Sequence, residues 1–486
     1  MHIVFVASEC VPYAKTGGLA DVIGALPREI VRQGHQVTVY LPFYRQVQKL
    51  GKQAKVAIPS ITIPGQSFSR FASVMDGGVH DGVQFYFVDI PEFFDREGLY
   101  GVKGREYGDN GERYGLFCRV VIESVKQLGV PDLFHVHDWQ ASMVPVMLRT
   151  LYSLDPVLRK VPCLLTIHNA GEAFQGRFPS SVIDKLLLPW DLYTPEWLEF
   201  YNQVNFLKGG IVYCDAMTTV SRKYAEEIQT PELGNGLDGV LRARSIELTG
   251  ILNGIDYNEW NPATDRKIAA HYTAERPEAK ADCRRDLLHA FGLQRAKGDR
   301  PVLGMVSWLA TQKGFDLLAE GMPELMERDV LLVVLGTGEA YYEGLLRSLA
   351  EKYPDRVAVK VAYDNTLAHK IEAGADIFLM PSRYEPCGLS QMYSLKYGTV
   401  PVVHATGGLE DTIEEWNPEQ GTGTGFKFAN YDVGAFLDAL RRALEAYKDR
   451  ENWRVLMRNG MLRDFSWTVP AGEYVKQYEE CVRRRS

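Results

Sequence analysis

The chain has 486 residues, of which 46% are hydrophobic and 24% are charged, as is typical of a soluble globular protein. This length suits two or three domains, each with its own core. The formal net charge of −8 argues against a nucleic-acid or anionic-membrane partner. No apolar run approaches the length of a membrane span, and no basic region or cleavage site precedes the first apolar run, so we expect a cytoplasmic protein.

The cysteines are scattered and include no Cys-x-x-Cys pair. There are seven of them: Cys10, Cys118, Cys163, Cys214, Cys283, Cys387 and Cys481. This spacing fits neither a disulfide framework nor a zinc site, and it suits a reducing cytosol. No cluster of His, Cys and Asp has metal-ligand spacing either, so we expect no metal.

Short apolar runs alternate with helical patterns in the first half of the chain. Strands are expected at residues 3–7, 36–41, 83–89, 133–137, 163–168 and 216–220. The best helix candidate covers 114–128, where one face carries Phe117, Cys118, Val121, Val125 and Leu128. Strands that alternate with helices predict a parallel sheet covered on both faces. Residues 61–111 are richer in Gly, Phe and Asp, and we expect an insertion with antiparallel pairing there.

A polar, irregular stretch from Asn253 to Lys280 precedes a second alternating series. Its strands are expected at 302–307, 330–336, 357–361, 377–381 and 400–404. We therefore predict two doubly wound α/β domains with a hinge near residue 250. The first covers 1–250 and is completed by a terminal helix within 466–486, and the second covers 251–465.

One octapeptide occurs twice with small changes, as residues 16–23 and again as residues 406–413. Each copy follows a candidate strand and opens a candidate helix with a glycine pair. Paired glycines let a ligand approach the backbone N–H groups at a helix N-terminus. One copy in each half suggests that both domains face one cleft; the alternative is a purely structural strand–helix turn.

Other polar residues stand where strands are expected to end. Lys15 precedes the first glycine pair and Lys313 follows the strand at 302–307, so either could meet a diphosphate or be a solvated surface lysine. His137-Asp138-Trp139 ends one expected strand and His168-Asn169 ends another, and two histidines that end neighbouring strands should cluster. A single histidine in such a place is more often a satisfied core residue.

Glu385 lies between the apolar run 376–381 and a short helix expected over 389–397. It should therefore stand in a turn at the carboxyl end of a strand, where open α/β sheets bind ligands. A carboxylate there suits hydrogen bonds to hydroxyl groups better than binding of phosphate. The alternative is that Glu385 is an acidic residue in the first turn of a helix.

Several common motifs are missing from the sequence. No G-x-G-x-x-G follows the first strand, no G-x-x-x-x-G-K-[ST] occurs, and no G-x-S-x-G is present. A dinucleotide oxidoreductase, a P-loop kinase and a serine hydrolase are therefore poorly supported.

Seven motifs, in this order, resemble those of bacterial glycogen synthases and plastid starch synthases. They are Lys15-Thr-Gly-Gly-Leu-Ala-Asp21, His137-Asp-Trp139, Thr166-Ile-His-Asn169, Asn253-Gly-Ile-Asp256, Gln312-Lys-Gly314, Glu385-Pro-Cys-Gly388 and Thr406-Gly-Gly408. The similarity continues to Asp464-Phe-Ser-Trp467 and so covers nearly the whole chain. It implies a retaining glycosyltransferase that extends the non-reducing end of an α-1,4-glucan from ADP-glucose without a cofactor. It also implies two Rossmann-like domains in the GT-B arrangement, with the final helix returning to the first.

The resemblance implies a role for each donor-side residue. Lys15 and the N–H groups of Gly17 and Gly18 would lie near the donor diphosphate, and Lys313 would neutralise the leaving phosphates. Glu385 would bind hydroxyls of the transferred glucose. The remaining expected donor contacts are Tyr363 against the adenine, and Cys387, Gly388, Leu389, Ser390, Gly407 and Gly408 around the phosphates and sugar.

The resemblance also implies an acceptor side. Asp138 and His168 would line the sugar and acceptor side of the cleft, with Asn253 nearby. Asp21 would hold the glycine turn or reach the acceptor.

Three departures from the family pattern stand out. Trp308 occupies a position where the family has an arginine that clamps the donor phosphates, and Arg383 is a candidate replacement. The segment 168–176 looks about two residues longer than usual, which affects the acceptor side. Glu410 replaces a small residue after the second glycine pair, either near phosphate or toward solvent. These departures keep two alternatives open: a catalytically silent homologue that binds glucan or nucleotide, and a transferase for another nucleotide sugar.

Overall fold

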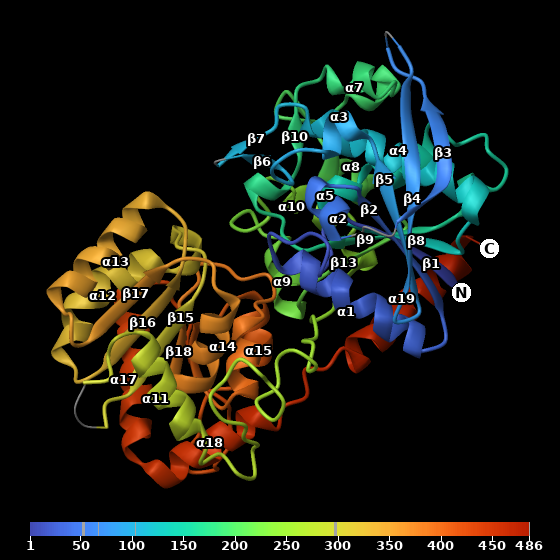
Figure 1. The fold of residues 1–486 in the computed structure, drawn as a ribbon. Coiled ribbons are helices and arrows are strands. Elements are labelled where there is room, and N and C mark those ends of the chain that lie inside the picture. The colour runs from blue at the N-terminus through green and yellow to red at the C-terminus, as the bar shows by residue number, and fades with distance from the viewer. Residues whose placement is uncertain (51–53, 67, 103, 296–298, 486) are drawn as a thin grey trace. The chain divides into compact units, whose positions relative to one another are not determined.

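The computed structural model describes residues 1–50, 54–66, 68–102, 104–295 and 299–485. They form two compact units (Figure 1). Unit 1 comprises residues 1–254 together with 467–486, of which Ser486 lies outside the described residues, and unit 2 comprises residues 255–466. The division between the units falls between Gly254 and Ile255.

Unit 1 is built on a nine-stranded sheet in the order β14-β13-β9-β8-β1-β2-β5-β4-β3. Its strands are β1 (His2–Val6), β2 (Gln36–Pro42), β3 (Lys55–Ile63), β4 (Arg70–His80), β5 (Val83–Asp89), β8 (Leu133–His137), β9 (Cys163–Ile167), β13 (Ala216–Thr219) and β14 (Leu248–Gly250). From β14 to β5 neighbouring strands pair in parallel. The chain winds outward from β1 in both directions, so the strand order reverses between β1 and β8, which is where doubly wound sheets bind ligands.

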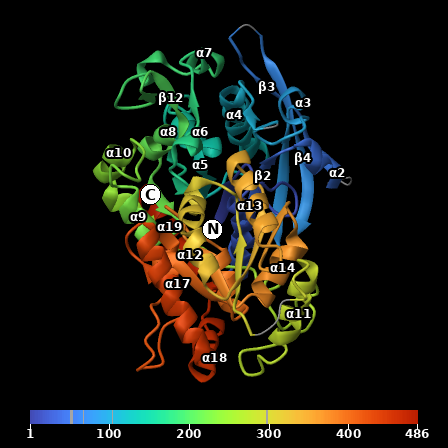
Figure 2. The same ribbon diagram turned by 90° about the vertical axis from the view of Figure 1, so that its left-hand side faces the viewer.

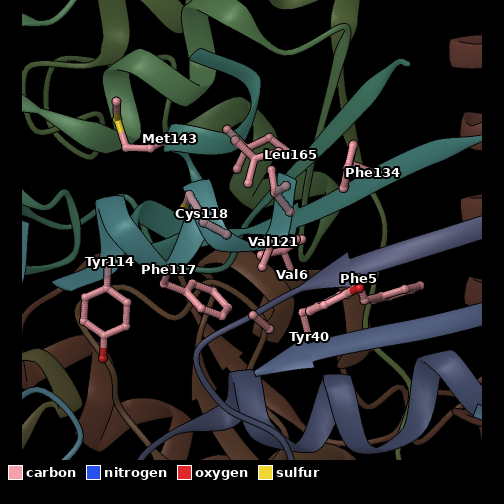
Figure 3. Packing of buried hydrophobic residues seen from close by; sticks show 14 of the residues in the cluster. Phe5, Val6, Tyr40, Tyr114, Phe117, Cys118, Val121, Phe134, Met143 and Leu165 are labelled. Carbon is pink, nitrogen blue, oxygen red and sulfur yellow. The ribbon is translucent and has the colours of Figure 1, made fainter. Parts of the chain in front are cut away.

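The helices of unit 1 connect these strands. They are α1 (Gly18–Arg32), α2 (Arg45–Leu50), α3 (Pro91–Phe94), α4 (Asn110–Leu128), α5 (Asp138–Ala141), α6 (Met143–Arg149), α7 (Val182–Lys185), α8 (Phe206–Tyr213), α9 (Arg222–Glu227), α10 (Asp238–Ala243) and α19 (Thr468–Arg485). The predicted helix at 114–128 is the body of α4. Its predicted apolar face is in the core, with Leu128 only partly buried, and Figure 3 shows Phe117 and Val121 beside Val6 of β1.

The antiparallel insertion predicted within 61–111 is present. β3 pairs antiparallel with β4, and β4 pairs antiparallel with β5 at the edge of the large sheet. Two further small sheets lie outside it: β6 (Gly101–Val102) with β7 (Arg105–Glu106), and β10 (Arg177–Phe178), β11 (Glu199–Phe200) and β12 (Gln203–Asn205).

The terminal helix α19 belongs to unit 1, as predicted. It lies beside α1 and against β8 and β9 (Figure 1). Tyr474, Tyr478 and Cys481 are buried in the unit 1 core. The Tyr478 hydroxyl lies 2.9 Å from Nδ1 of His135 on β8, so the end of the chain completes the packing of a central strand.

Unit 2 contains a six-stranded sheet in the order β17-β16-β15-β18-β19-β20, and every neighbouring pair is parallel. Its strands are β15 (Val302–Val306), β16 (Leu331–Gly336), β17 (Val357–Val361), β18 (Ile377–Met380), β19 (Val400–His404) and β20 (Phe426–Phe428). Its helices are α11 (Lys280–Ala290), α12 (Phe315–Glu327), α13 (Ala340–Lys352), α14 (Asn365–Gly374), α15 (Ser390–Lys396), α16 (Gly407–Thr412), α17 (Val433–Lys448) and α18 (Arg450–Met461).

Both faces of the unit 2 sheet are covered by helices. Along β16, Leu332 and Val334 join one apolar cluster with α12 and α17, which lie side by side (Figure 2). Leu331 and Val333 join a second cluster with α11 and α14. Because side chains alternate between the faces of a strand, these two clusters lie on opposite faces. The prediction of two doubly wound α/β units is therefore confirmed.

The segment 255–280 is tied to unit 2 rather than loose. The ring of Trp260 stacks on His369 at a centroid distance of 3.7 Å and on Tyr393 at 3.9 Å. Nδ1 of His369 lies 2.6 Å from Oδ2 of Asp265, which also accepts a hydrogen bond from the Tyr397 hydroxyl. These contacts fix the segment against α14 and α15.

No helix among the described residues is long and apolar enough to cross a membrane.

Candidate functional site

One group of candidate site residues lies in unit 1 and follows β1, at the point where the strand order of this unit reverses. The chain leaves β1, doubles back through a Cys10–Ala14 bridge and reaches residues 15–18, which we call the glycine turn. Lys15 and Asp21 form an ion pair of 2.6 Å across this turn. The prediction that Asp21 holds the turn or reaches the acceptor was made from resemblance, and the structure pairs it with Lys15.

Glu9 was not predicted to have a role, yet it organises the glycine turn. Its buried carboxylate accepts hydrogen bonds from the N–H groups of Thr16 (2.5 Å) and Gly17 (3.1 Å), and from the hydroxyls of Thr16 and Tyr100 (both 2.6 Å). The N–H of Gly17, expected near the donor diphosphate, is thus directed at Glu9. Glu9 does stand just after a strand, and this signal could have drawn attention to it.

The two glycine pairs have different surroundings. A Cβ atom added to Gly17 would meet nothing within 4 Å, and its φ of −146° suits any residue. Nothing within unit 1 therefore requires a glycine at this position, which leaves approach of a ligand as a reason for it. By contrast, a Cβ atom on Gly408 would lie 1.9 Å from the carbonyl oxygen of Cys387.

Asp138 and His168 come together, as predicted, because β8 and β9 are neighbours. Oδ1 of Asp138 accepts a hydrogen bond of 2.7 Å from the backbone N–H of His168. Asp138 has a left-handed backbone with a φ of +54°, a sparsely populated conformation for a residue with a side chain. Nε2 of His168 lies 3.0 Å from Nδ1 of His137, whose other ring nitrogen is buried without a partner among the described residues.

Burial shifts the pKa values of this cluster in opposite directions for acids and bases. It raises the pKa of Asp138 to about 7, against the stabilising N–H groups of His168 and Asn169. It lowers the pKa of His168 to about 3 and holds the pKa of His137 well below its usual range. The two histidines are therefore neutral near pH 7, while Asp138 can exchange a proton there.

Asn253 is a buried residue at the end of unit 1. Its side-chain oxygen has no hydrogen-bond partner among the described residues. A buried polar atom of this kind is costly unless another group satisfies it.

In unit 2, a second group of candidate site residues is centred on Lys313 and Glu385. Lys313 follows β15 and Glu385 follows β18, the two strands between which the order of this sheet reverses. Nζ of Lys313 lies 2.9 and 2.7 Å from the two carboxylate oxygens of Glu385. The hydroxyl of Ser382, which was not predicted, donates to Oε2 at 3.0 Å. The helix after Glu385 begins only at Ser390, so Glu385 is not a first-turn residue.

The second glycine pair packs on the Glu385 loop. The N–H of Gly408 donates to the carbonyl of Glu385 at 3.1 Å, and Gly407 has a φ of +44°. A Cβ atom on Gly407 would lie 1.9 Å from the carbonyl oxygen of Glu385. For this second copy of the octapeptide, the glycines have a structural role, because both of them allow close packing against the loop that contains Glu385.

The residues after Glu385 form a turn that leads into α15. Cys387 is buried, Gly388 has a φ of +71°, and Leu389 precedes the first helical residue, Ser390. Gln391 donates to the carbonyl oxygens of Cys387 (3.0 Å) and Gly388 (2.9 Å) and so braces the turn. Gln391 lies in the first turn of α15 and was not predicted to have a role.

Two exposed aromatic residues follow strands of unit 2. Tyr363, expected against the adenine, is 81% exposed and comes just after β17. Trp308 comes just after β15 and is 59% exposed. A side chain in either position is available to a ligand at the carboxyl edge of the sheet.

The other residues that concern the departures from the family pattern interact with specific neighbours. Arg383, the candidate replacement for the expected arginine, binds Asp316 at 3.0 Å and lies over the ring of Tyr431 at 4.3 Å. Glu410 is paired with Lys427 at 2.9 Å, so it is neither an isolated charge nor simply directed at solvent. In the segment 168–176, Gln175 is buried and bonds the carbonyls of Ala170 and Asn235.

The predicted site residues are divided between the two units. Unit 1 holds Lys15, Gly17, Gly18, Asp21, Asp138, His168 and Asn253; unit 2 holds Lys313, Tyr363, Glu385, Cys387, Gly388, Leu389, Ser390, Gly407 and Gly408. Among the described residues, no group of three or more His, Cys, Asp and Glu side chains could hold a metal ion.

Comparison with known families gives matches in both units. Residues 2–243 match the starch synthase catalytic domain, and residues 292–458 match the glycosyl transferases group 1 family. The chain is 57% identical to a glycogen synthase of Koribacter versatilis over 486 residues, covering 100% of this chain and 99% of that one. It is 45% identical to a glycogen synthase of Thermotoga maritima over 494 residues, covering 100% and 99%.

A solved structure agrees over the full length. The catalytic domain of starch synthase IV from Arabidopsis thaliana, bound to ADP and acarbose, matches with a TM-score of 0.90 and 32% identity, covering 99% of each chain. The sucrose-phosphate synthase of Thermosynechococcus elongatus, 18% identical with a TM-score of 0.61, shares the fold. These full-length matches favour an active synthase over the alternative of a silent homologue. The chain therefore belongs to the glycogen and starch synthase family, and it is a glycosyltransferase of glucan synthesis.

Proposed function

We propose that the chain transfers glucose from ADP-glucose to the non-reducing end of an α-1,4-glucan, with retention of the anomeric configuration and without a metal. The observation that carries this proposal is the Glu385 carboxylate, buried at the carboxyl end of β18 and held by Lys313 and Ser382. A carboxylate fixed in this way can accept hydrogen bonds from sugar hydroxyls. The cytoplasmic location expected from the sequence stays a prediction.

The donor side of this proposal lies in unit 2. The ammonium group of Lys313 lies where the strand order reverses. The negative charge that develops on a leaving diphosphate would lie beside this ammonium group. The exposed ring of Tyr363 offers a stacking surface for an adenine base. The related structure of starch synthase IV contains ADP, and this supports an adenine nucleotide as part of the donor.

The sugar and acceptor side of the proposal lies in unit 1. Asp138 and His168 present a carboxyl group and a neutral imidazole, both suited to hydrogen-bond sugar hydroxyls. In a retaining transfer without a metal, a leaving phosphate oxygen can take the acceptor's proton, so no strongly basic side chain is required. The proposed absence of a cofactor follows from this chemistry.

Turnover with different nucleotide sugars tests the proposal. Purified protein with glycogen should release ADP from ADP-glucose and do so at least tenfold faster, by kcat/KM, than it releases UDP or GDP from their glucose derivatives. The new linkage should give the α-anomeric proton signal in NMR spectra. No release of ADP, or a preference for UDP-glucose, would overturn the proposed donor.

A further inference from the structure

Glu9 is a buried carboxylate at the site whose role neither the sequence motifs nor the family matches specify. It is 4% exposed and accepts four hydrogen bonds. Three of them come from Thr16 and Gly17 in the glycine turn. The fourth comes from Tyr100, which lies about ninety residues further along the chain and is also within 2.8 Å of the Ser8 hydroxyl.

These contacts fix the glycine turn from the inside. A buried carboxylate is tolerated only when its oxygens are satisfied, and here both oxygens bind two donors each. Hydrogen bonds to a charged acceptor are also stronger than neutral ones. Two successive N–H groups of the turn are therefore held toward Glu9, and the turn cannot rotate without breaking both bonds.

The same contacts divide the N–H groups of this region into two sets. Those of Thr16 and Gly17 point at Glu9, whereas those of Gly18 and Leu19, at the start of α1, have no hydrogen bond with a described residue. The first N–H groups of a helix lack partners within the helix. Gly17 is the last residue of the first set, with open space where a side chain would be.

We propose that Glu9 is a positioning residue for the donor: it holds Thr16 and Gly17 inward, so that the glycine turn presents Gly18 and Leu19 in the conformation that receives the nucleotide sugar. This inference rests on the proposed function for the identity of the donor. It assigns the expected diphosphate contact to the N–H groups that follow Gly17 rather than to that of Gly17.

The charge of Glu9 also acts on Asp138, the acidic residue that follows the neighbouring strand β8. Burial is the main cause of the raised pKa of Asp138, and the negative charge of Glu9 adds to it. Removing that charge should therefore shift any pH dependence that reports Asp138 toward lower pH.

The test compares Glu9→Gln with Tyr100→Phe. Glutamine matches glutamate in size, but its NH2 group cannot accept from the turn, whereas Tyr100→Phe removes one donor to Glu9 and leaves the turn bonds intact. For Glu9→Gln, we expect the KM for ADP-glucose to rise about tenfold with kcat changed less than threefold. We also expect hydrogen–deuterium exchange to quicken at residues 14–20. Tyr100→Phe should raise KM less than threefold.

A folded Glu9→Gln protein with unchanged KM and unchanged exchange would overturn the proposal, as would a fall in kcat at constant KM. If Glu9→Gln does not fold, Thr16→Ala, which removes only the hydroxyl bond, should still raise KM about threefold, and an unchanged KM would overturn the proposal. The exchange measurement needs no donor. It therefore tests the hold of Glu9 on the turn even if ADP-glucose proves to be the wrong substrate.

Discussion

The ammonium group of Lys313 contacts both carboxylate oxygens of Glu385, at 2.9 and 2.7 Å, across the reversal point of the unit 2 sheet. These two residues are 72 positions apart in the sequence. Each residue balances the charge of the other, and each keeps hydrogen-bonding capacity for a ligand, because an ammonium has three donors and a carboxylate about four acceptor positions. Lys313 thus holds the Glu385 carboxylate in a fixed orientation before substrate arrives.

Glu385→Gln should reduce kcat about 10²–10³-fold, since it removes the negative charge that we propose faces the transferred sugar, while it keeps the side-chain volume. Binding of ADP, measured by calorimetry, should change less than threefold. Ser382→Ala is the matched control, because it removes only one hydrogen bond to the same carboxylate, and it should cost less than tenfold in kcat. Retained turnover in Glu385→Gln would remove Glu385 from its proposed role.

Trp308→Arg should raise kcat/KM for ADP-glucose about tenfold, since a charge-assisted hydrogen bond to phosphate is worth roughly 1.5–3 kcal/mol. The side chain is 59% exposed, so the substitution should leave the thermal unfolding temperature nearly unchanged. Trp308→Leu serves as the control that removes the ring without adding charge, and it should not raise kcat/KM. A lower or unchanged kcat/KM in Trp308→Arg would mean that the site already compensates for the missing arginine.

Gly17→Ala and Gly408→Ala should separate binding from folding. Gly17 has open space around it, so alanine should leave the unfolding temperature unchanged and raise the KM for the donor about tenfold or more. Alanine at Gly408 would collide with the carbonyl of Cys387, so it should destabilise the protein by about 1–3 kcal/mol. Thermal unfolding and steady-state kinetics of both variants check this contrast, and equal destabilisation by the two substitutions would contradict it.

Asp138→Asn should change how stability depends on pH. The folded-state pKa of Asp138, about 7, lies above its unfolded value of 3.8, so between these values the folded protein binds more protons than the unfolded one. Asp138 therefore makes the free energy of unfolding fall as pH rises from about 4 to 7. One proton corresponds to at most about 1.4 kcal/mol per pH unit.

Denaturant titrations between pH 4 and 8 measure this effect. In Asp138→Asn, the decrease in the free energy of unfolding that Asp138 causes should be absent. The stability of the variant relative to the parent protein should therefore rise with pH and level off above about pH 7. The control is Ser142→Ala, which removes a hydrogen bond to the backbone carbonyl of Asp138 but keeps the Asp138 carboxyl, so the fall with pH should remain in this variant. If the pH profiles of the parent and of Asp138→Asn were parallel, burial would not raise the pKa of the Asp138 carboxyl.

The sequence by itself determined the order and type of the main elements. Apolar runs such as Cys163–Ile167 and Val302–Val306 are strands as predicted, because strands buried in parallel sheets are almost continuously hydrophobic and so are easily identified. It also determined that Lys313 and Glu385 stand at strand ends, because the position of a turn follows from the local pattern. The ordered motifs added the family, which the full-length matches confirmed.

Only the tertiary structure decided which of these residues touch. The pairing of Lys313 with Glu385 and the packing of Gly408 on Cys387 depend on which strands are neighbours. The hydrogen bonds of Glu9 to Thr16 and Gly17 depend on how the chain doubles back after β1. Local periodicity contains neither kind of information. The two glycine pairs read alike in the sequence, yet one faces open space and the other lies against a neighbouring loop. The physical reason is that burial and hydrogen bonding are set by long-range contacts, whereas periodicity reports only the immediate neighbours of each residue along the chain.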